Sequence, residues 1–288
     1  MTYNKKILRP RIGAHVGTSG GVSRAIENAL VIGAECIQIF GTSPRQWRAK
    51  SPSDEEVKKF KEAREKAGIS PVYLHAAYLV NLASANGDLL KKSADNLAAH
   101  LSIAERLGAE GLIFHTGSGK GIDKEKALVQ EIRVIKEILK KIKGRARLFM
   151  ENTAGGGAKI GDAHDLGRIF YGVGSERLGI CFDTAHAFQA GLLDKYDTAS
   201  VKKLFDEWDK AVGLENIAVL HINDSKTAAG SHNDRHENIG RGQIGVSGFR
   251  ALAGDRRLWS KPWILEVPGY DGEGPDKKNI QALTSLFS

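Results

Sequence analysis

The segment from Arg147 to Asp183 reads RLFMENTAGGGAKIGDAHDLGRIFYGVGSERLGICFD and contains one complete unit of a repeating pattern. It opens with the apolar run LFM, which ends at Glu151, and closes with the run ICF, which ends at Asp183. Short apolar runs of this kind are typical of buried strands. The residues at 162–170, between the two runs, have a helical pattern. The segment therefore predicts two strands joined by a helix, with a carboxylate at the end of each strand.

The same unit repeats along the chain. Apolar runs predict strands over 11–16, 36–40, 72–76, 111–115, 147–151, 178–183, 217–222 and 262–267. Helical stretches alternate with them over 21–33, 53–67, 87–107, 123–142, 162–170, 199–211, 246–253 and 275–287. Four helices are expected to end at glycine, the usual stop signal, at Gly33, Gly68, Gly108 and Gly144. Eight strand–helix units predict an α/β protein, a single-domain (β/α)8 TIM barrel over 1–288, with an open doubly wound sheet as the rival.

Ionisable residues stand at or just past the ends of six predicted strands, and one more follows three residues after Asp183. The set is His75, His115, Glu151, Asp183, His186, His221 and Glu266. Burying so many ionisable groups is unfavourable unless something binds them, and a cluster of divalent cations is the obvious candidate. Imidazole and carboxylate without thiolate suit zinc, manganese or iron(II).

The positions of these residues also decide between the two folds. Neighbouring strands lie roughly 4.8 Å apart, so in a flat sequential sheet His75 and Glu266 would be roughly 24 Å apart and could not share a metal cluster. Closing the sheet brings all eight strand ends around one mouth, where barrel enzymes carry their chemistry. The ligand set and the closed barrel therefore support each other.

Two loops and one histidine add to this site. The longest irregular stretch runs from 223 to 246, and its Asp234 and His236 point to the same side if the segment is extended, which favours a metal role. The basic segment 41–50 contains Trp47, and a basic loop with a tryptophan suits phosphate contact and base stacking. Taken alone, however, this segment predicts a turn at the barrel rim. His15 ends the first predicted strand. We expect it to support a metal ligand or to contact substrate rather than to bind a metal directly.

Composition places the chain among ordinary globular proteins. Of its 288 residues 41% are hydrophobic and 26% are charged, and the formal charge of +8 raises the odds of a polyanionic partner. Cys36 and Cys181 both lie inside apolar runs and are expected to be buried free thiols. We find no apolar run long enough to span a bilayer and no signal peptide, so we expect a cytoplasmic monomer without a membrane partner, associated with the nucleoid when acting.

Several motifs resemble those of one known family. The stretch HINDSKTAAGSHNDRH at 221–236 is similar to the signature of the endonuclease IV family of apurinic/apyrimidinic (AP) endonucleases. Shorter motifs of that family occur in the same order. They are RQW at 45–47, HAAYL at 75–79, FHTGS at 114–118, ENTAG at 151–155 and GICFDTAH at 179–186. The resemblance covers about 11–269, nearly the whole chain. It departs from the family at Ala77, Gly119 and Ala185, none of which is a ligand position.

The resemblance implies a TIM barrel that binds three Zn²⁺ ions, with Mn²⁺ or Fe²⁺ as possible substitutes. By this resemblance the first ion is held by His75, His115 and Glu151; the second by Glu151, Asp183, His221 and Glu266; the third by His186, Asp234 and His236. Glu151 and Glu266 are the expected catalytic residues. The resemblance also implies that Arg45, Tyr78 and Leu79 enter the DNA duplex and that Gln46 contacts the strand.

The activity implied by the family is hydrolysis of the phosphodiester bond 5′ to an abasic site in duplex DNA, which leaves a 3′-hydroxyl and a 5′-deoxyribose phosphate. The main alternative is a metal-dependent sugar isomerase or epimerase on the same barrel. Such a site would use the set Glu151, Asp183, His221 and Glu266. It would leave His186, Asp234 and His236 without a role. A non-catalytic protein that binds abasic DNA is a third alternative, and the complete ligand set argues against it.

Overall fold

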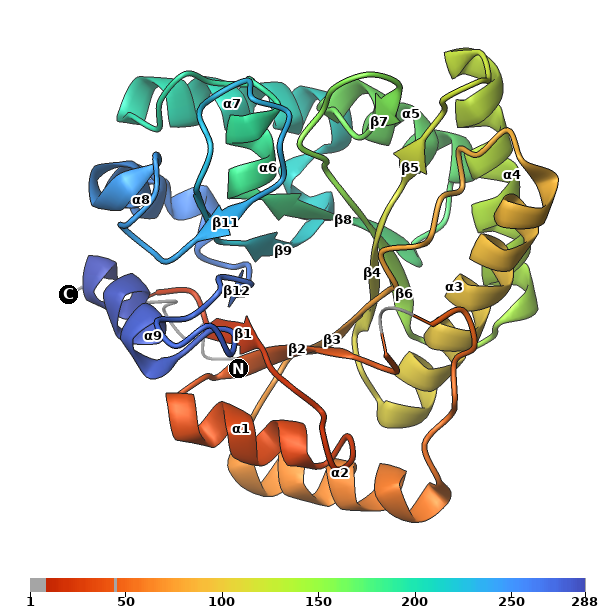
Figure 1. Ribbon diagram of the computed structural model, residues 1–288, viewed down its shortest axis with the longest axis horizontal. Coiled ribbons are helices and arrows are strands. Elements are labelled where there is room, and N and C mark those ends of the chain that lie inside the picture. Colours follow the sequence, from red (N-terminus) through yellow and green to blue (C-terminus); the bar gives the residue numbers. More distant parts are fainter. Residues whose placement is uncertain (1–8, 44–45, 288) are drawn as a thin grey trace, which may run out of the picture.

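The computed structural model describes residues 9–43 and 46–287, and its main sheet is a closed barrel of parallel strands (Figure 1). The strands are β1 (Ile12–His15), β2 (Cys36–Phe40), β3 (Val72–His75), β4 (Gly111–His115), β6 (Arg147–Glu151), β8 (Leu178–Asp183), β9 (Ile217–His221) and β12 (Trp263–Leu265). They neighbour one another in sequence order, and β12 pairs with β1 to close the barrel. The predicted (β/α)8 barrel is confirmed, and the open sheet is wrong.

Helices surround the barrel (Figure 1). They are α1 (Arg24–Ile32), α2 (Asp54–Ala67), α3 (Gly87–Leu107), α4 (Lys124–Lys141), α5 (Ala163–Val173), α6 (Thr184–Gln189), α7 (Thr198–Val212), α8 (Gly245–Gly254) and α9 (Lys277–Thr284), with 3₁₀ turns at Leu214–Asn216, Arg256–Leu258 and Ser285–Phe287. The sequence did not predict α6. Within the described residues, none of the helices is long and apolar enough to cross a bilayer.

Three of the four predicted glycine stops are confirmed. Gly33, Gly68 and Gly108 each follow a helix with positive φ, and each donates its backbone N–H to carbonyls of the last turn. The expected stop at Gly144 is wrong, because α4 ends earlier, at Lys141. There Ile142 leaves the helix in an extended conformation while its N–H still reaches the carbonyl of Ile138.

The hydrophobic core has two parts. The larger part lies between the barrel and its helices. The smaller fills the barrel interior and consists of Cys36, Tyr73, Ile113, Phe149, Cys181, Val219 and Ile264, with Ala218 packed against it. The two cysteines are free and fully buried, as predicted. Each inner residue comes from a different strand, so a single layer of side chains fills the barrel.

This inner layer explains the position of the polar residues. Side chains alternate along a strand, so the residue two positions further on points to the same side. The residues two positions after the inner layer are Gln38, His75, His115, Glu151, Asp183, His221 and Glu266. They form the next layer of the barrel, at the carboxyl ends of the strands. Because side chains two residues apart point to the same side of a strand, these seven polar side chains lie together at one mouth.

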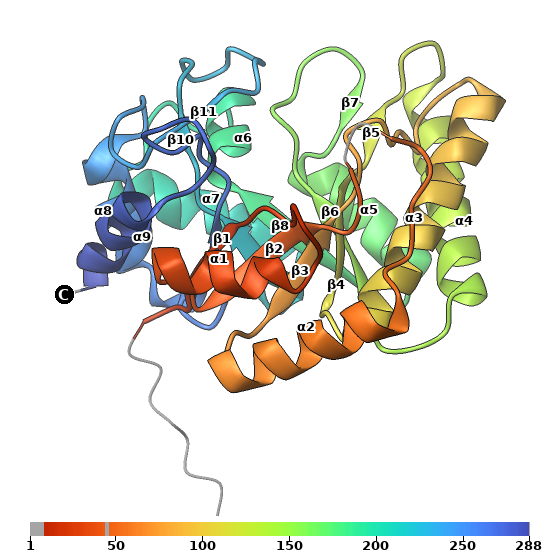
Figure 2. The same ribbon diagram turned by 60° about the horizontal axis from the view of Figure 1, so that its bottom comes forward.

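Loops over this mouth carry two short antiparallel sheets (Figure 2). One joins β5 (Gly117–Ser118) to β7 (Lys159–Ile160), and the other joins β10 (Asp224–Ser225) to β11 (His236–Glu237). The second lies inside the stretch 223–246, so the prediction that this stretch is irregular throughout is wrong. The buried Asp224 carboxylate orders it by accepting hydrogen bonds of 2.9–3.0 Å from the backbone N–H groups of Gly240, Gly242 and Ile244.

Candidate metal centre

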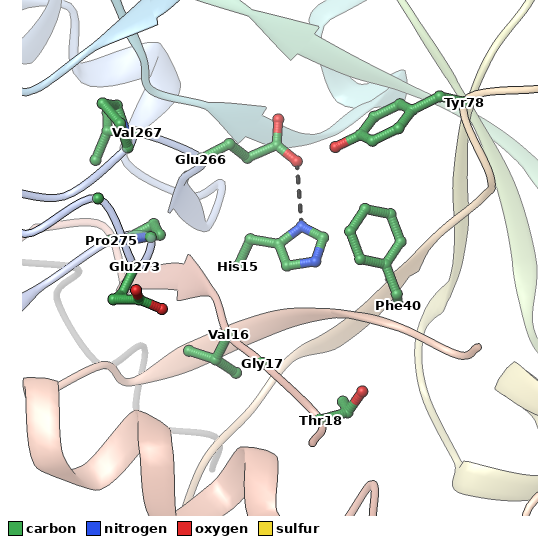
Figure 3. Close-up of a pocket in the computed structure, with 13 residues that line it drawn as sticks. His15, Val16, Gly17, Thr18, Phe40, Tyr78, Glu266, Val267, Glu273 and Pro275 are labelled. Carbon is green, nitrogen blue, oxygen red and sulfur yellow. Dashed lines mark hydrogen bonds and ion pairs between the residues drawn. The ribbon is translucent and has the colours of Figure 1, made fainter. Parts of the chain in front are cut away.

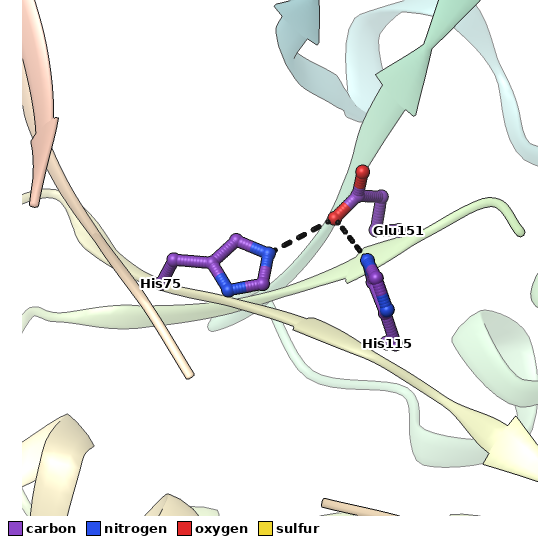
Figure 4. Close-up of side chains that lie close together, drawn as sticks. All are labelled: His75, His115 and Glu151. Carbon is purple, nitrogen blue, oxygen red and sulfur yellow. Dashed lines mark hydrogen bonds and ion pairs between the residues drawn. The ribbon is translucent and has the colours of Figure 1, made fainter. Parts of the chain in front are cut away.

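Glu151 lies at the centre of the mouth, and four histidines surround its carboxylate. Oε2 is 3.2 Å from His75 Nε2 and 3.1 Å from His115 Nε2 (Figure 4). Oε1 is 3.0 Å from His221 Nδ1 and 3.2 Å from His186 Nδ1. Glu151 is fully buried. Its two oxygens therefore face two different pairs of imidazoles, an arrangement that suits a carboxylate shared between two cations.

The remaining predicted ligands extend this cluster on two sides. His221 Nδ1 is 3.1 Å from Glu266 Oε2 and 3.9 Å from Asp183 Oδ2. Asp183 Oδ2 is in turn 3.9 Å from His236 Nε2. Asp234 faces both outer histidines, with its oxygens 3.2 Å from His186 Nε2 and 3.4 Å from His236 Nε2. The structure thus brings all nine predicted ligands together.

Eight of the nine predicted ligands fall into three overlapping groups whose ligand atoms lie within 4.8 Å of one another, and Asp234 lies beside the third group, facing His186 and His236. The three groups are His75, His115 and Glu151; Glu151, Asp183, His221 and Glu266; and Asp183, His186 and His236. Among the described residues, the buried Nε2 atoms of His186 and His236 make no hydrogen bond, and Asp234 faces them only at ion-pair distances of 3.2 and 3.4 Å. Buried polar atoms without a hydrogen bond are unfavourable, and a cation held between these three side chains would satisfy both nitrogens. The nitrogen and oxygen donors present therefore fit divalent transition metals.

Carboxylates and imidazoles at the site shift each other's pKa. Burial raises the pKa of Glu151, but His221 and His115 outweigh this effect and hold that pKa well below its ordinary value. Burial lowers the pKa of His186, but Asp183 and Asp234 reverse this and hold it well above its ordinary value. Glu151 therefore stays ionised, and without a cation a proton on His186 offsets part of the negative charge of the site.

The sequence reasoning missed Gln38, which is fully buried in the mouth layer. Its Oε1 lies 2.7 Å from His221 Nε2, and its Nε2 lies 2.8 Å from His15 Nδ1 and donates a hydrogen bond to Glu266 Oε1. The signal was present in the sequence. Gln38 is a polar residue inside the apolar run CIQIF, two positions after Cys36, where the strand period makes it point into the barrel.

Two asparagines that follow strand ends were also missed. Asn152 holds the backbone of Asp183 in both directions, since its Nδ2 donates to the Asp183 carbonyl and its Oδ1 accepts from the Asp183 N–H. Asn223 donates to Asp183 Oδ2 at 2.6 Å and accepts from the Glu266 N–H at 2.7 Å. Both asparagines are fully buried. They fix the orientation of two candidate ligands.

Of the four predicted DNA contacts, Arg45 lies outside the described residues and the other three are exposed. Tyr78 is 64% exposed and Leu79 is 40% exposed, and Gln46 is also on the surface. The Tyr78 ring is nevertheless anchored, with its centroid 5.6 Å from that of Phe40 and 5.8 Å from that of His75. Tyr78 thus stands beside the candidate metal centre with most of its surface free.

A cavity of about 400 Å³ opens next to Glu266 (Figure 3). His15 forms part of its wall, with Nδ1 3.4 Å from Glu266 Oε1 and its ring 4.3 Å from that of Phe40. Tyr78 lines both this cavity and a second one of about 320 Å³, which reaches His115 and His186. His15 therefore contacts the candidate ligand Glu266 and borders this cavity.

Together, the closed barrel and the imidazole–carboxylate mouth define a class of enzymes built on one fold. Residues 26–286 match the family described as xylose isomerase-like TIM barrel. A solved D-tagatose 3-epimerase-like protein shares this fold, with a TM-score of 0.71 and 17% identity over 95% of this chain and 96% of that one. At that identity the likeness concerns the fold alone.

Sequence relatives place the chain more narrowly. It is 38% identical over 280 residues to a probable endonuclease 4 of Chloroflexus aggregans, covering 96% of this chain and 98% of that protein. It is 40% identical over 283 residues to a probable endonuclease 4 of Cenarchaeum symbiosum, covering 96% and 99%. The crystal structure of endonuclease IV from Thermus thermophilus matches with a TM-score of 0.82 and 36% identity over 96% of this chain and 98% of that one. The chain belongs to the endonuclease IV family of DNA-repair nucleases.

Proposed function

We propose that this enzyme hydrolyses the phosphodiester bond 5′ to abasic sites in duplex DNA, leaving a 3′-hydroxyl and a 5′-deoxyribose phosphate, with three zinc ions bound at the mouth. The observation that carries the proposal is the convergence of nine donors around Glu151 in a chain of the endonuclease IV family. A sugar isomerase would need only Glu151, Asp183, His221 and Glu266. The outer group formed by His186, Asp234 and His236 favours the nuclease.

When bound, divalent cations would activate water at neutral pH and neutralise negative charge on phosphate oxygens. The protein supplies the frame for this chemistry. Glu151 presents one oxygen to His75 and His115 and the other to His186 and His221, so it would link two of the ions. Glu266 belongs to one ligand group and also faces the open cavity, which suits contact with the reacting strand.

The exposed residues at the rim would let the enzyme select an abasic site over normal DNA. An abasic nucleotide has no base to unstack, so moving it out of the duplex costs less than flipping a normal nucleotide. Tyr78 and Leu79 expose apolar surface beside the site and would fill the space that the missing base leaves. The formal charge of +8 would supply affinity for the phosphate backbone that weakens with salt.

The experiment that tests the proposal is a nicking assay on end-labelled duplex with a single abasic site, run beside an assay of sugar isomerisation. We expect metal-dependent incision immediately 5′ to the lesion and no isomerisation. Mapping both new ends identifies the products. Isomerisation without incision would establish the rival enzyme, and tight binding of abasic duplex without incision would establish a non-catalytic binder.

Replacing Tyr78 with alanine should weaken binding of abasic duplex by about 1–3 kcal/mol, the range found when a base-stacking aromatic is removed. The expected effect on the cleavage rate at saturating DNA is smaller, because Tyr78 is not among the candidate ligands. Affinity measured in Ca²⁺, or with an uncleavable phosphorothioate duplex, checks this. Tyr171→Ala is a matched control, since Tyr171 is 63% exposed on α5. Equal losses in the two variants would remove Tyr78 from the DNA interface.

A further inference from the structure

Gln38 connects two histidines and one carboxylate of the mouth through a single side-chain amide. We propose that Gln38 is a positioning residue that decides which ring nitrogen carries the proton in both His221 and His15. It thereby leaves His221 Nδ1 free to bind a cation and makes His15 a hydrogen-bond donor at the wall of the substrate cavity.

Hydrogen-bond chemistry fixes the orientation of the amide. Glu266 belongs to one ligand group, and a carboxylate that binds a cation must be ionised. An ionised carboxylate only accepts hydrogen bonds. The group that faces Glu266 Oε1 must therefore be the amide NH₂ of Gln38 rather than its oxygen. Gln38 Oε1 then faces His221, at 2.7 Å from Nε2.

The proton of His221 follows from this orientation. Gln38 Oε1 only accepts, so His221 Nε2 must carry the hydrogen that joins them. In the neutral imidazole the lone pair then lies on Nδ1. Nδ1 is the atom that faces Glu151 Oε1 at 3.0 Å and Glu266 Oε2 at 3.1 Å. Gln38 therefore selects the tautomer of His221 that a cation at this group needs.

The proton of His15 follows from the second hydrogen of the same NH₂ group. One hydrogen goes to Glu266, and the other is directed at His15 Nδ1, 2.8 Å away. Nδ1 then accepts, so His15 carries its proton on Nε2. In the part of the chain that the structure describes, this Nε2 is buried without a hydrogen-bond partner. His15 also lines the cavity beside Glu266 (Figure 3), so a water or substrate oxygen that enters there would satisfy this buried N–H.

This inference rests on the proposed cation sites but not on the proposed DNA substrate. The amide contributes no ligand itself. Its loss should act through His221 and Glu266, two members of one ligand group. Removing a group that orients metal ligands commonly weakens metal affinity or activity by about 10–100-fold. We expect that loss at the group containing His221, with a smaller change at the group of His75 and His115.

The test compares zinc-loaded wild-type protein with the variant Gln38→Met, which keeps the side-chain length and removes all three polar contacts. Long-range ¹H–¹⁵N spectra of the imidazoles report which ring nitrogen is protonated and which binds zinc. In the wild type we expect His221 to bind zinc through Nδ1 and His15 to carry its proton on Nε2. In Gln38→Met we expect His15 to populate both tautomers and one zinc ion to dissociate about 10–100-fold more readily.

Gln130→Met is the matched control. Gln130 donates from one amide to the carbonyls of Leu82 and Ser84, so the variant also loses partly buried hydrogen bonds, but it should leave the imidazole spectra unchanged. Coordination of His221 through Nε2 in the wild type overturns the inference, even if Gln38→Met does not fold. So do unchanged tautomers and zinc affinity in Gln38→Met. Failure of the wild type to incise abasic DNA would instead count against the proposed function.

Discussion

Glu151→Gln should lower the rate of abasic-site incision at least as much as removal of one preorganised charge-stabilising group, which costs about 10²–10³-fold. Glutamine keeps the shape of the side chain but offers one oxygen and no charge. In the native site both oxygens of Glu151 are in use, and four imidazole nitrogens lie within 3.2 Å of them. The substitution therefore replaces the oxygen donor of one ligand group with an NH₂ group, leaves the other group a neutral oxygen, and removes the charge that both groups share. Single-turnover incision rates and zinc content per chain measure the two consequences.

A buried carboxylate elsewhere in the protein provides the control. Glu131 on α4 is fully buried, and neither of its oxygens has a hydrogen-bond partner among the described residues. Glu131→Gln changes a buried acid to the same amide outside the three ligand groups, so incision and zinc content should stay at the wild-type level. If Glu151→Gln retains near-normal incision with three zinc ions bound, Glu151 does not link two ions and the proposed arrangement of the site is wrong.

The sequence predicted the barrel and its mouth because both follow from one period. Each buried strand contributes an inner residue and, two positions later, a residue at the mouth, as Phe149 and Glu151 do on β6. Polar residues at strand ends are easy to recognise, since the preceding apolar run marks the strand. Glu266 was found in this way although β12 ends one residue before it.

The parts that the sequence did not predict depend on single side-chain contacts. The short helix α6 begins at Thr184 because the Asp183 carboxylate accepts from the His186 N–H at 2.7 Å, so one candidate ligand also caps the helix that carries another. Asp224 on β10 holds the loop that follows β11, because its carboxylate accepts a hydrogen bond from the Gly240 N–H. Gln38 was missed because it lies in the middle of β2, whereas the other polar residues of the mouth were recognised at the ends of their strands. Only the positions of its neighbours show what it does.

Removing the bound cations should abolish incision, and returning Zn²⁺ should restore it. Without cations, Asp183 and Asp234 hold the pKa of His186 well above its ordinary value, so this imidazole carries a proton at neutral pH. A cation can bind its Nε2 only after that proton leaves. Cation binding must therefore release protons, and lowering the pH must weaken it. Calorimetric titrations of chelator-treated protein with Zn²⁺, in buffers of different ionisation enthalpy, count the protons released.

The coupling between cation binding and protonation also determines how much cations stabilise the folded protein. A cation that binds only the folded state at a free concentration 100 times its dissociation constant stabilises that state by about 2.7 kcal/mol per independent site. Thermal unfolding of the metal-free protein should therefore begin at a lower temperature, and Zn²⁺ should raise that temperature less at acidic pH than at neutral pH. The variant Asp234→Asn distinguishes proton release from His186 from nonspecific binding of zinc. The substitution weakens the attraction that keeps His186 protonated, so fewer protons should be released per zinc ion. Proton release equal to that of the wild type would mean that His186 does not exchange a proton for a cation.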